Sequence, residues 1–401
     1  MRTVWTFHIA QSIVFGQGAV NQLGEIATRL RAKKALIVTD PILEKAGLLQ
    51  RVRDPLASAG LTVSAFTGGE PEPSMKAALA CYEQAKSFGP DVLIGLGGGS
   101  NMDLAKLAAT LLKHGGSPRD YVGDDKIPGP VFPLICVPTT AGTGSEVSAA
   151  SVVTDTENHI KVGILSNWLR PSAAVVDPLM TVTGPPKVTA DSGIDALTHA
   201  IEAYTAIDNA DFPLPAGERS VYQGKHPMGD ICAERAIRLV GKYLRRAVKN
   251  GNDLEAREGM ALAALLAGMA FSNVGVALVH AMEYPVGGAV HCSHGAGNGL
   301  LLPYVMRFNL PAKTRAFAEI AAMLDENVTG LDERTAAERA VIAVEELRND
   351  IGVPQRLRDL GVKQEQLRGL AEKTFGIKRI LRVNPRSVTV EEIEGIFNEA
   401  Y

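Results

Sequence analysis

The amino-acid sequence changes character near residue 185, and this change limits the possible folds more than any other feature. Before it, short apolar runs such as KKALIVTD and DVLIGLGGGS alternate with helical patterns such as MKAALACYEQAKSFG. This alternation predicts βαβ units and a parallel sheet. After TGPPK, long helical patterns dominate. A chain of 401 residues is longer than a domain with a single hydrophobic core usually is. We therefore expect two domains, an α/β domain over residues 1 to 185 and an all-α domain over residues 186 to 401.

Charge and cysteine usage narrow the class of protein. The net charge is -3, and the Lys and Arg residues are scattered, so we expect neither nucleic acid nor an anionic membrane as partner. The four cysteines form no CxxC pair and no signal peptide is evident, which favours reduced thiols and a cytoplasmic location. The uncharged run from Met260 to Met282 is long enough for a membrane span. We interpret it instead as a buried helix whose last turn carries His280.

Two pairs of residues predict a metal site. Asp195 and His199 are four residues apart in a stretch with helical spacing, so both side chains leave one face of a helix. His280 ends the apolar run, and His294 follows a glycine-rich turn that lets the chain fold back. Each residue alone fits a core histidine or a surface acid. Together they form a nitrogen and oxygen ligand set without thiolate, which suits Fe²⁺ or Zn²⁺, with Mn²⁺ and Co²⁺ also open.

Two glycine-containing loops predict a nucleotide site on a Rossmann-like sheet. In DVLIGLGGGSNMDLAK an apolar strand runs into Gly97, Gly98 and Gly99, and Ser100 can cap the helix that follows. The motif only approximates GxGxxG, and a structural tight turn is the alternative. After another strand, VPTTAGTGSEVS offers hydroxyls for ribose or diphosphate oxygens. They belong to Thr139, Thr140, Thr143, Ser145 and Ser148.

Asp40 follows the strand ALIVT, where a carboxylate can bind the adenosine ribose and repel a 2′-phosphate. Its alternative role is the N-cap of the next helix. We therefore expect NAD rather than NADP as cofactor. A polar segment, residues 205 to 230, interrupts the helical half after the first ligand pair, and we expect a lid or pocket wall there. Within it, Arg219 and Lys225 are either exposed charges or partners of a substrate carboxylate.

The motifs GGGSNMDLAK, PTTAGTGSE, DALTHAIEAY, HAMEYPVGG and HGAGN follow one another along the chain, and the sequence resembles the iron-containing (group III) alcohol dehydrogenases. The resemblance implies a nucleotide-binding α/β domain, a helical metal domain and a dimer or larger homo-oligomer. It implies four metal ligands, Asp195, His199, His280 and His294. The implied cofactor contacts are Asp40, Gly97 to Ser100, Asp103, Thr139, Thr140, Thr143 and Lys161, to which the hydroxyl pattern adds Ser148.

Two positions depart from the family pattern. Many members have a histidine where this chain has Tyr284, so a proton relay through an imidazole does not carry over, and Tyr284 is expected in the pocket. The PNP motif reads Pro71-Glu72-Pro73 here. We expect a metal-dependent enzyme that transfers a hydride between NAD(H) and a primary alcohol or aldehyde.

Two other enzyme activities stay open as alternatives. Two short segments, HAMEYPVGG and SVYQGKHPMGD, are similar to hydroxyacid-oxoacid transhydrogenases. They leave a 4-hydroxybutyrate-type hydroxyacid dehydrogenase or transhydrogenase as the first alternative. A lyase like 3-dehydroquinate synthase is disfavoured, because the helical half around the ligands is apolar.

Overall fold

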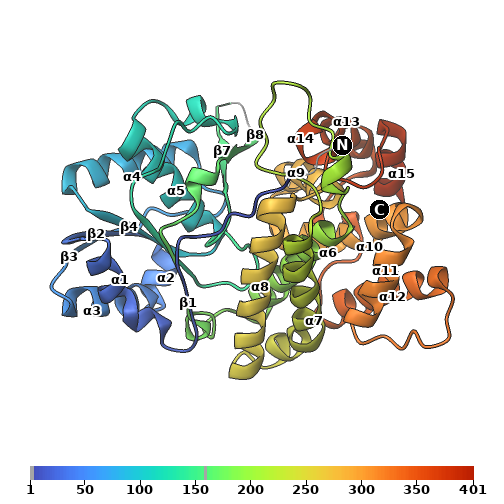
Figure 1. Cartoon of the computed structure of the whole chain (residues 1–401), viewed down its shortest axis with the longest axis horizontal. Coiled ribbons are helices and arrows are strands. Elements are labelled where there is room, and N and C mark those ends of the chain that lie inside the picture. The colour runs from blue at the N-terminus through green and yellow to red at the C-terminus, as the bar shows by residue number, and fades with distance from the viewer. Residues whose placement is uncertain (1–3, 158–159) are drawn as a thin grey trace. The chain divides into compact units, whose positions relative to one another are not determined.

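The computed structural model describes residues 4–157 and 160–401, which separate into two compact units (Figure 1). One unit contains residues 8–184 and 219–221, and we call it the α/β unit. The other contains the described residues before His8 together with residues 185–218 and 222–401, and we call it the helical unit. The contacts thus divide beside Pro185, where the sequence pattern changes.

The centre of the α/β unit is a parallel sheet. In the described residues it has six strands in the order β1-β9-β6-β4-β2-β3, and every pairing is parallel. The strands are β1 Ile13–Phe15, β2 Lys34–Val38, β3 Thr62–Phe66, β4 Val92–Gly97, β6 Leu134–Pro138 and β9 Ala173–Val176. A smaller sheet pairs β8 (Ile160–Leu165) with β7 (Ala150–Asp155) and β5 (Gly123–Asp124).

Helices cover both faces of the large sheet because its strands are apolar on both sides. Along β2, Leu36 and Val38 enter one core cluster, whereas Ala35 and Ile37 enter another. Helices α4 (Met75–Phe88) and α5 (Gly99–His114) pack in the first cluster, and α3 (Leu48–Ser58) packs in the second (Figure 1). The short helices α1 (Leu23–Arg29) and α2 (Pro41–Lys45) complete this unit. Such two-sided burial is expected of parallel strands.

The chain reverses direction across the sheet between β2 and β4. From β2 it continues outward to β3, whereas from β4 it continues the other way to β6. The helices that follow β2 and β4 therefore lie on opposite faces. In open α/β sheets, ligands bind at the carboxyl ends of the strands beside such a reversal. Asp40 lies two residues after β2, Gly97 is the last residue of β4 and Thr139 directly follows β6, so all three lie at this edge.

The helical unit confirms the second half of the predicted fold class, an α/β part followed by an all-α part. Its main helices are α6 Pro186–Thr205, α7 Pro227–Lys249, α8 Leu254–Val274, α9 Leu278–Val290, α10 His294–Asn309, α11 Thr314–Met323, α12 Glu333–Asp350, α13 Leu367–Gly376, α14 Lys378–Leu381 and α15 Val390–Ala400. Helix α6 is buried over most of its length, so its polar side chains point into the protein.

The apolar run from Met260 to Met282 is two helices, so the prediction of one helix that ends at His280 is wrong. Helix α8 stops at Val274, α9 starts at Leu278, and the two helices meet at 102°. Gly275 causes the break: its φ is +122°, and a Cβ there would lie 2.6 Å from Val383 Cγ2. His280 therefore lies in the first turn of α9. Among the described residues, no single helix has the length and apolar character of a membrane span.

Candidate functional site

Helices α6, α9 and α10 bring the predicted metal ligands together. Asp195 and His199 lie one turn apart on α6, both buried, and their nearest nitrogen and oxygen, His199 Nδ1 and Asp195 Oδ2, are 3.9 Å apart. His280 comes from the start of α9 and His294 from the start of α10. The four residues thus come from three helices that are separated along the chain.

The glycines of HGAGNG explain how α10 reaches α6. A Cβ at Gly295 would clash with the backbone oxygen of Asp191, and one at Gly299 would lie 2.6 Å from Ile194 Cγ2. Only glycine lets the two helices approach this closely. The predicted glycine-rich turn before His294 is wrong, because Gly287 and Gly288 lie inside α9. The chain turns instead at His291, whose φ is +51°.

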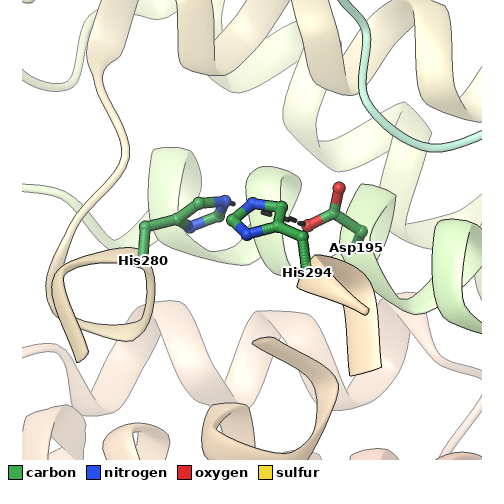
Figure 2. A group of neighbouring side chains, drawn as sticks. All are labelled: Asp195, His280 and His294. Carbon is green, nitrogen blue, oxygen red and sulfur yellow. Dashed lines mark ion pairs between the residues drawn. The ribbon is translucent and has the colours of Figure 1, made fainter. Parts of the chain in front are cut away.

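Three potential ligand atoms converge at this crossing. Asp195, His280 and His294 each offer one atom, and these atoms all lie within 4.8 Å of one another. Nε2 of His280 and Nε2 of His294 lie 3.8 and 3.9 Å from Asp195 Oδ1. Both rings point toward the Asp195 carboxylate (Figure 2). Two imidazoles and a carboxylate at this spacing form an open site for a divalent cation.

His199 is near this group without belonging to it. Its ring stacks on that of His280 with centroids 4.7 Å apart, and on Phe271 with centroids 4.1 Å apart. Its place among the ligands stays a prediction.

Glu202, one turn beyond His199 on α6, holds the His280 ring. Its carboxylate accepts from His280 Nδ1 at 2.6 Å, and also from the backbone nitrogens of Ala277 and Val279 at 2.8 and 2.7 Å. It therefore caps α9 and orients the histidine in that helix's first turn. Because Nδ1–H donates to the carboxylate, the lone pair of His280 is on Nε2, which faces Asp195.

Glu283 does the same for His294. It is fully buried, and its Oε2 accepts from His294 Nδ1 at 2.5 Å. The lone pair of His294 is therefore also on Nε2. Carboxylates that fix ligand histidines in this way are common behind metal ions in proteins.

Asn298 tests whether a cation fits the site. Its Nδ2 lies 2.8 Å from Asp195 Oδ1 and 3.1 Å from Nε2 of both His280 and His294. An amide NH₂ has two hydrogens and faces three acceptors here. Its Oδ1 is buried and has no hydrogen-bond partner among the described residues. Acceptors that converge on one point with too few donors fit a positive ion.

The charge state of Asp195 agrees with this reading. Burial works to raise the pKa of its carboxyl group. The imidazoles of His199, His294 and His280 and the hydrogen bond from Asn298 outweigh that effect, so the pKa is lowered. Asp195 is therefore an anion available to a cation.

In the α/β unit, the two predicted nucleotide loops lie side by side. A Cβ at Gly98 would lie 3.5 Å from Thr140 Oγ1, and one at Gly99 would lie 3.1 Å from Thr143 Cγ2. Thr140 Oγ1 is buried and has no hydrogen-bond partner among the described residues. Helix α5 begins at Gly99, with Gly98 as its N-cap and no capping side chain. Ser100 is therefore in the first turn, and its predicted role as the cap is wrong.

Asp40 occupies the N-cap of α2, as its alternative role required. Oδ1 accepts from the backbone nitrogens of Ile42 and Leu43 at 2.8 and 3.0 Å. Oδ2 accepts from Asn101 Nδ2 at 2.6 Å. Sequence reasoning did not single out Asn101, although it follows Ser100 directly. The carboxylate is thus fixed at the end of β2 beside the glycine turn.

Other predicted cofactor contacts take part in a buried network around Lys106. Its Nζ, fully buried, lies 2.9 Å from the hydroxyl oxygens of both Ser145 and Ser148 and 2.8 Å from the carbonyl oxygen of Ala150. Asp103 Oδ1 accepts from the Ser145 hydroxyl at 2.6 Å. This network fixes the loop after β6 to α5. Direct contacts of Asp103 and Ser148 with a cofactor stay predictions, as does that of Thr139, which is buried at the end of β6.

The remaining predicted site residues differ in the groups that they contact. Lys161 pairs with Glu72 at 2.6 Å. Tyr284 is on α9, which continues past it, and its ring centroid lies 6.1 Å from that of His294. Arg219 is exposed and pairs with Asp125 at 3.2 Å, whereas Lys225 pairs with Asp230 at 2.6 Å.

The segment of residues 205 to 230 is held against the end of α8. Within the helical unit, the backbone nitrogens of Gln223 and Gly224 donate to the carbonyl oxygens of Asn273 and Val274 at 3.1 and 3.0 Å. A role for this segment as a lid or pocket wall stays a prediction.

Comparison with known proteins gives one consistent result. The model of the iron-containing alcohol dehydrogenases matches residues 10–178, and the model of the C-terminal part of that family matches residues 216–401. The NAD-dependent methanol dehydrogenase of Bacillus methanolicus is 39% identical to this chain, over 98% of this chain and 99% of that enzyme's sequence. The 1,3-propanediol dehydrogenase of Klebsiella pneumoniae is 40% identical over 96% of both chains.

A solved structure shares the whole fold. The crystal structure of a 1,3-propanediol oxidoreductase superposes with a TM-score of 0.93 at 38% identity, over 99% of this chain and 100% of that one. Family models and relatives both extend over nearly the full length. The chain belongs to the iron-containing alcohol dehydrogenase family.

Proposed function

We propose that this enzyme transfers a hydride between NAD(H) and a primary alcohol and its aldehyde, and that it binds Fe²⁺ or Zn²⁺ through Asp195, His199, His280 and His294. The observation that carries the proposal is the convergence of one carboxylate and two oriented imidazoles at the crossing of α6, α9 and α10. Family membership supports the reaction class.

The protein's own residues prepare this site before any substrate arrives. Glu202 and Glu283 hold two imidazoles with Nε2 facing Asp195, and Asn298 donates to Asp195 Oδ1. A divalent cation bound there supplies Lewis acidity, which makes an alcohol hydroxyl more acidic and polarises a carbonyl. No side chain is needed as a nucleophile for hydride transfer.

We assign the nucleotide to the edge formed by the ends of β2, β4 and β6. The glycine turn at Gly98 leaves room beside the buried hydroxyl of Thr140, which suits phosphate oxygens. The fixed carboxylate of Asp40 suits the ribose of NAD and repels the extra phosphate of NADP. We therefore expect a preference for NAD that decreases in Asp40→Ala.

For the substrate, we propose short primary alcohols and diols. Two relatives are named for methanol and 1,3-propanediol. The hydroxyacid alternative gains no specific support, because Lys225 already pairs with Asp230 and Arg219 with Asp125. Tyr284, near His294, is proposed as part of the alcohol pocket.

A reconstitution experiment tests the proposal. The chain is stripped of metal with a chelator, reloaded with Fe²⁺ or Zn²⁺, and given NAD or NADP with methanol, 1,3-propanediol or 4-hydroxybutyrate. We expect reduced cofactor to form only with metal, faster from NAD than from NADP, and faster on the neutral alcohols. His280→Ala should be inactive, whereas His114→Ala, far along the chain on α5, should retain activity. Formation of NADH by metal-free protein or by His280→Ala would contradict the proposal.

A further inference from the structure

A cavity of about 450 Å³ lies in the helical unit away from the predicted ligands. It is bordered by α10, α12, α15 and the segment that follows α12. None of the four predicted metal ligands lines it. Three guanidinium groups do, those of Arg307, Arg348 and Arg356. Two glutamates, Glu345 and Glu399, line it as well, so the arginines outnumber the carboxylates by one.

Two of these arginines already have oxygen partners within the chain. Arg307 Nη2 lies 2.7 Å from Glu345 Oε2, so this pair is neutral overall. Arg356 Nη1 donates to the backbone oxygen of Glu399 at 2.6 Å. Both arginines are therefore held in place where they line the cavity.

Arg348 differs from both. It is only 4% exposed, and its Nη1 donates to the carbonyl oxygen of Leu300 at 3.1 Å. Its guanidinium also lies 5.7 Å from the centroid of the Tyr304 ring. Nε is buried with no acceptor, and no carboxylate forms an ion pair with Arg348 in the described part of the chain. A guanidinium carries five N–H donors and does not lose its charge.

A buried cation without a counter-ion is costly unless something outside the chain compensates it. The cavity that Arg348 lines gives such a partner a place, and the amide side chains of Asn349 and Gln355 also border it. Arginine binds the paired oxygens of carboxylates and phosphates with two parallel hydrogen bonds. The missing partner is therefore an anion rather than a neutral polar molecule.

We propose that this cavity binds a compact oxyanion, with Arg348 as its counter-ion and Arg307 and Arg356 as further donors. The shared chemistry is that of inorganic phosphate and of a small dicarboxylate. The proposal does not depend on the metal site or on the substrate, because it concerns no residue of either.

Calorimetric titration of the full chain tests it, with phosphate and malonate as separate probes at constant ionic strength. We expect one saturable site for at least one probe. Stronger binding of phosphate would identify a phosphoryl ligand, and stronger binding of malonate a carboxylate ligand. In Arg348→Met the affinity should fall about tenfold or more, since a charge-assisted hydrogen bond and a counter-ion are lost. Arg339→Met, an exposed arginine on the same helix, should bind as the wild type does.

Variants of the two more accessible arginines keep the test possible if the Arg348 variant misfolds. If Arg348→Met does not fold, Arg307→Met and Arg356→Met should weaken binding in the same direction. The absence of a saturable site for both probes in the wild type would overturn the proposal. Unchanged affinity in folded Arg348→Met, or in both other variants, would overturn it as well.

Discussion

Two buried polar clusters, one in each unit, each contain an aspartate but differ in what neutralises its charge. In the α/β unit, the oxygens of Ser145, Ser148 and Ala150 surround Lys106 Nζ, and Asp103 lies 3.8 Å away. This cluster contains its own cation. In the helical unit, Asp195 and the two imidazoles face one another, and the neutral amide of Asn298 lies within 3.1 Å of all three.

This difference distinguishes a buried network that only stabilises the fold from one that binds a ligand. Buried polar groups are normally satisfied within the protein, and a cluster that is complete holds loops and helices together. A cluster in which acceptors outnumber donors and face one another indicates a ligand from outside. The Lys106 cluster should therefore matter for stability without metal, and the Asp195 cluster should depend on metal.

Removing the internal cation should have the largest effect. Lys106→Met leaves the Asp103 carboxylate and two serine hydroxyls without their positive partner. We expect the free energy of unfolding to fall by about 3 to 5 kcal/mol in urea titrations, with or without metal. Lys113→Met, an exposed lysine of α5, is the control. A loss below about 1 kcal/mol, or one that metal restores, would remove the contrast between the clusters.

Adding and removing metal should act on the other cluster alone. With free metal at about a thousandfold above its dissociation constant, the wild type should gain about 4 kcal/mol of unfolding free energy. His280→Ala should lose most of this gain, whereas His114→Ala should keep it. The measurement is chemical unfolding with metal and with chelator. Equal metal stabilisation of both variants would contradict the assignment.

The pH dependence of stability tests the surroundings of the Lys106 cluster. Burial raises the pKa of Glu146, beside Ser145, from 4.5 to about 7. Between these two pH values the folded chain binds more protons than the unfolded chain, so the free energy of unfolding falls as pH rises. Glu146→Gln should remove this slope and be more stable than the wild type at pH 8 by about 3 kcal/mol. A variant less stable at pH 8 would contradict the argument.

The smallest expected effect concerns the carboxylates behind the histidines. Glu202→Gln keeps the size of the side chain but weakens its hold on His280 Nδ1. Metal affinity, measured by competition with a chelator, should fall about 10- to 100-fold. Glu338→Gln, at an exposed position of α12, should not change it. If Glu202→Gln loses folding stability in chelator but binds metal as before, Glu202 only caps α9.

Much of the fold followed from the sequence because its signals are local. Alternating apolar runs predicted the parallel sheet, and the spacing of Asp195 and His199 placed both on one helix face. The break at Gly275 is not local: the apolar pattern runs through it, and the approach of Val383 and the carboxylate of Glu202 determine where α9 begins. The prediction of a single helix failed for that reason.

The residues behind the ligands also had a signal that was missed. Each of the three predicted histidine ligands is followed about one helical turn later by a polar residue in an apolar stretch. These residues are Glu202 after His199, Glu283 after His280 and Asn298 after His294. Their bonds cross between helices, so Glu202 holds His280 and Glu283 holds His294. The spacing suggests that such residues matter, but only the packing of helices shows which ligand each one orients.

The most direct test of the central claim is the anomalous X-ray signal of a crystal grown with Fe²⁺ or Zn²⁺. We predict one strong peak about 2.0 to 2.2 Å from an Asp195 oxygen and from Nε2 of His280 and His294. A peak elsewhere, or none at this crossing of α6, α9 and α10 in metal-loaded protein, would contradict the account.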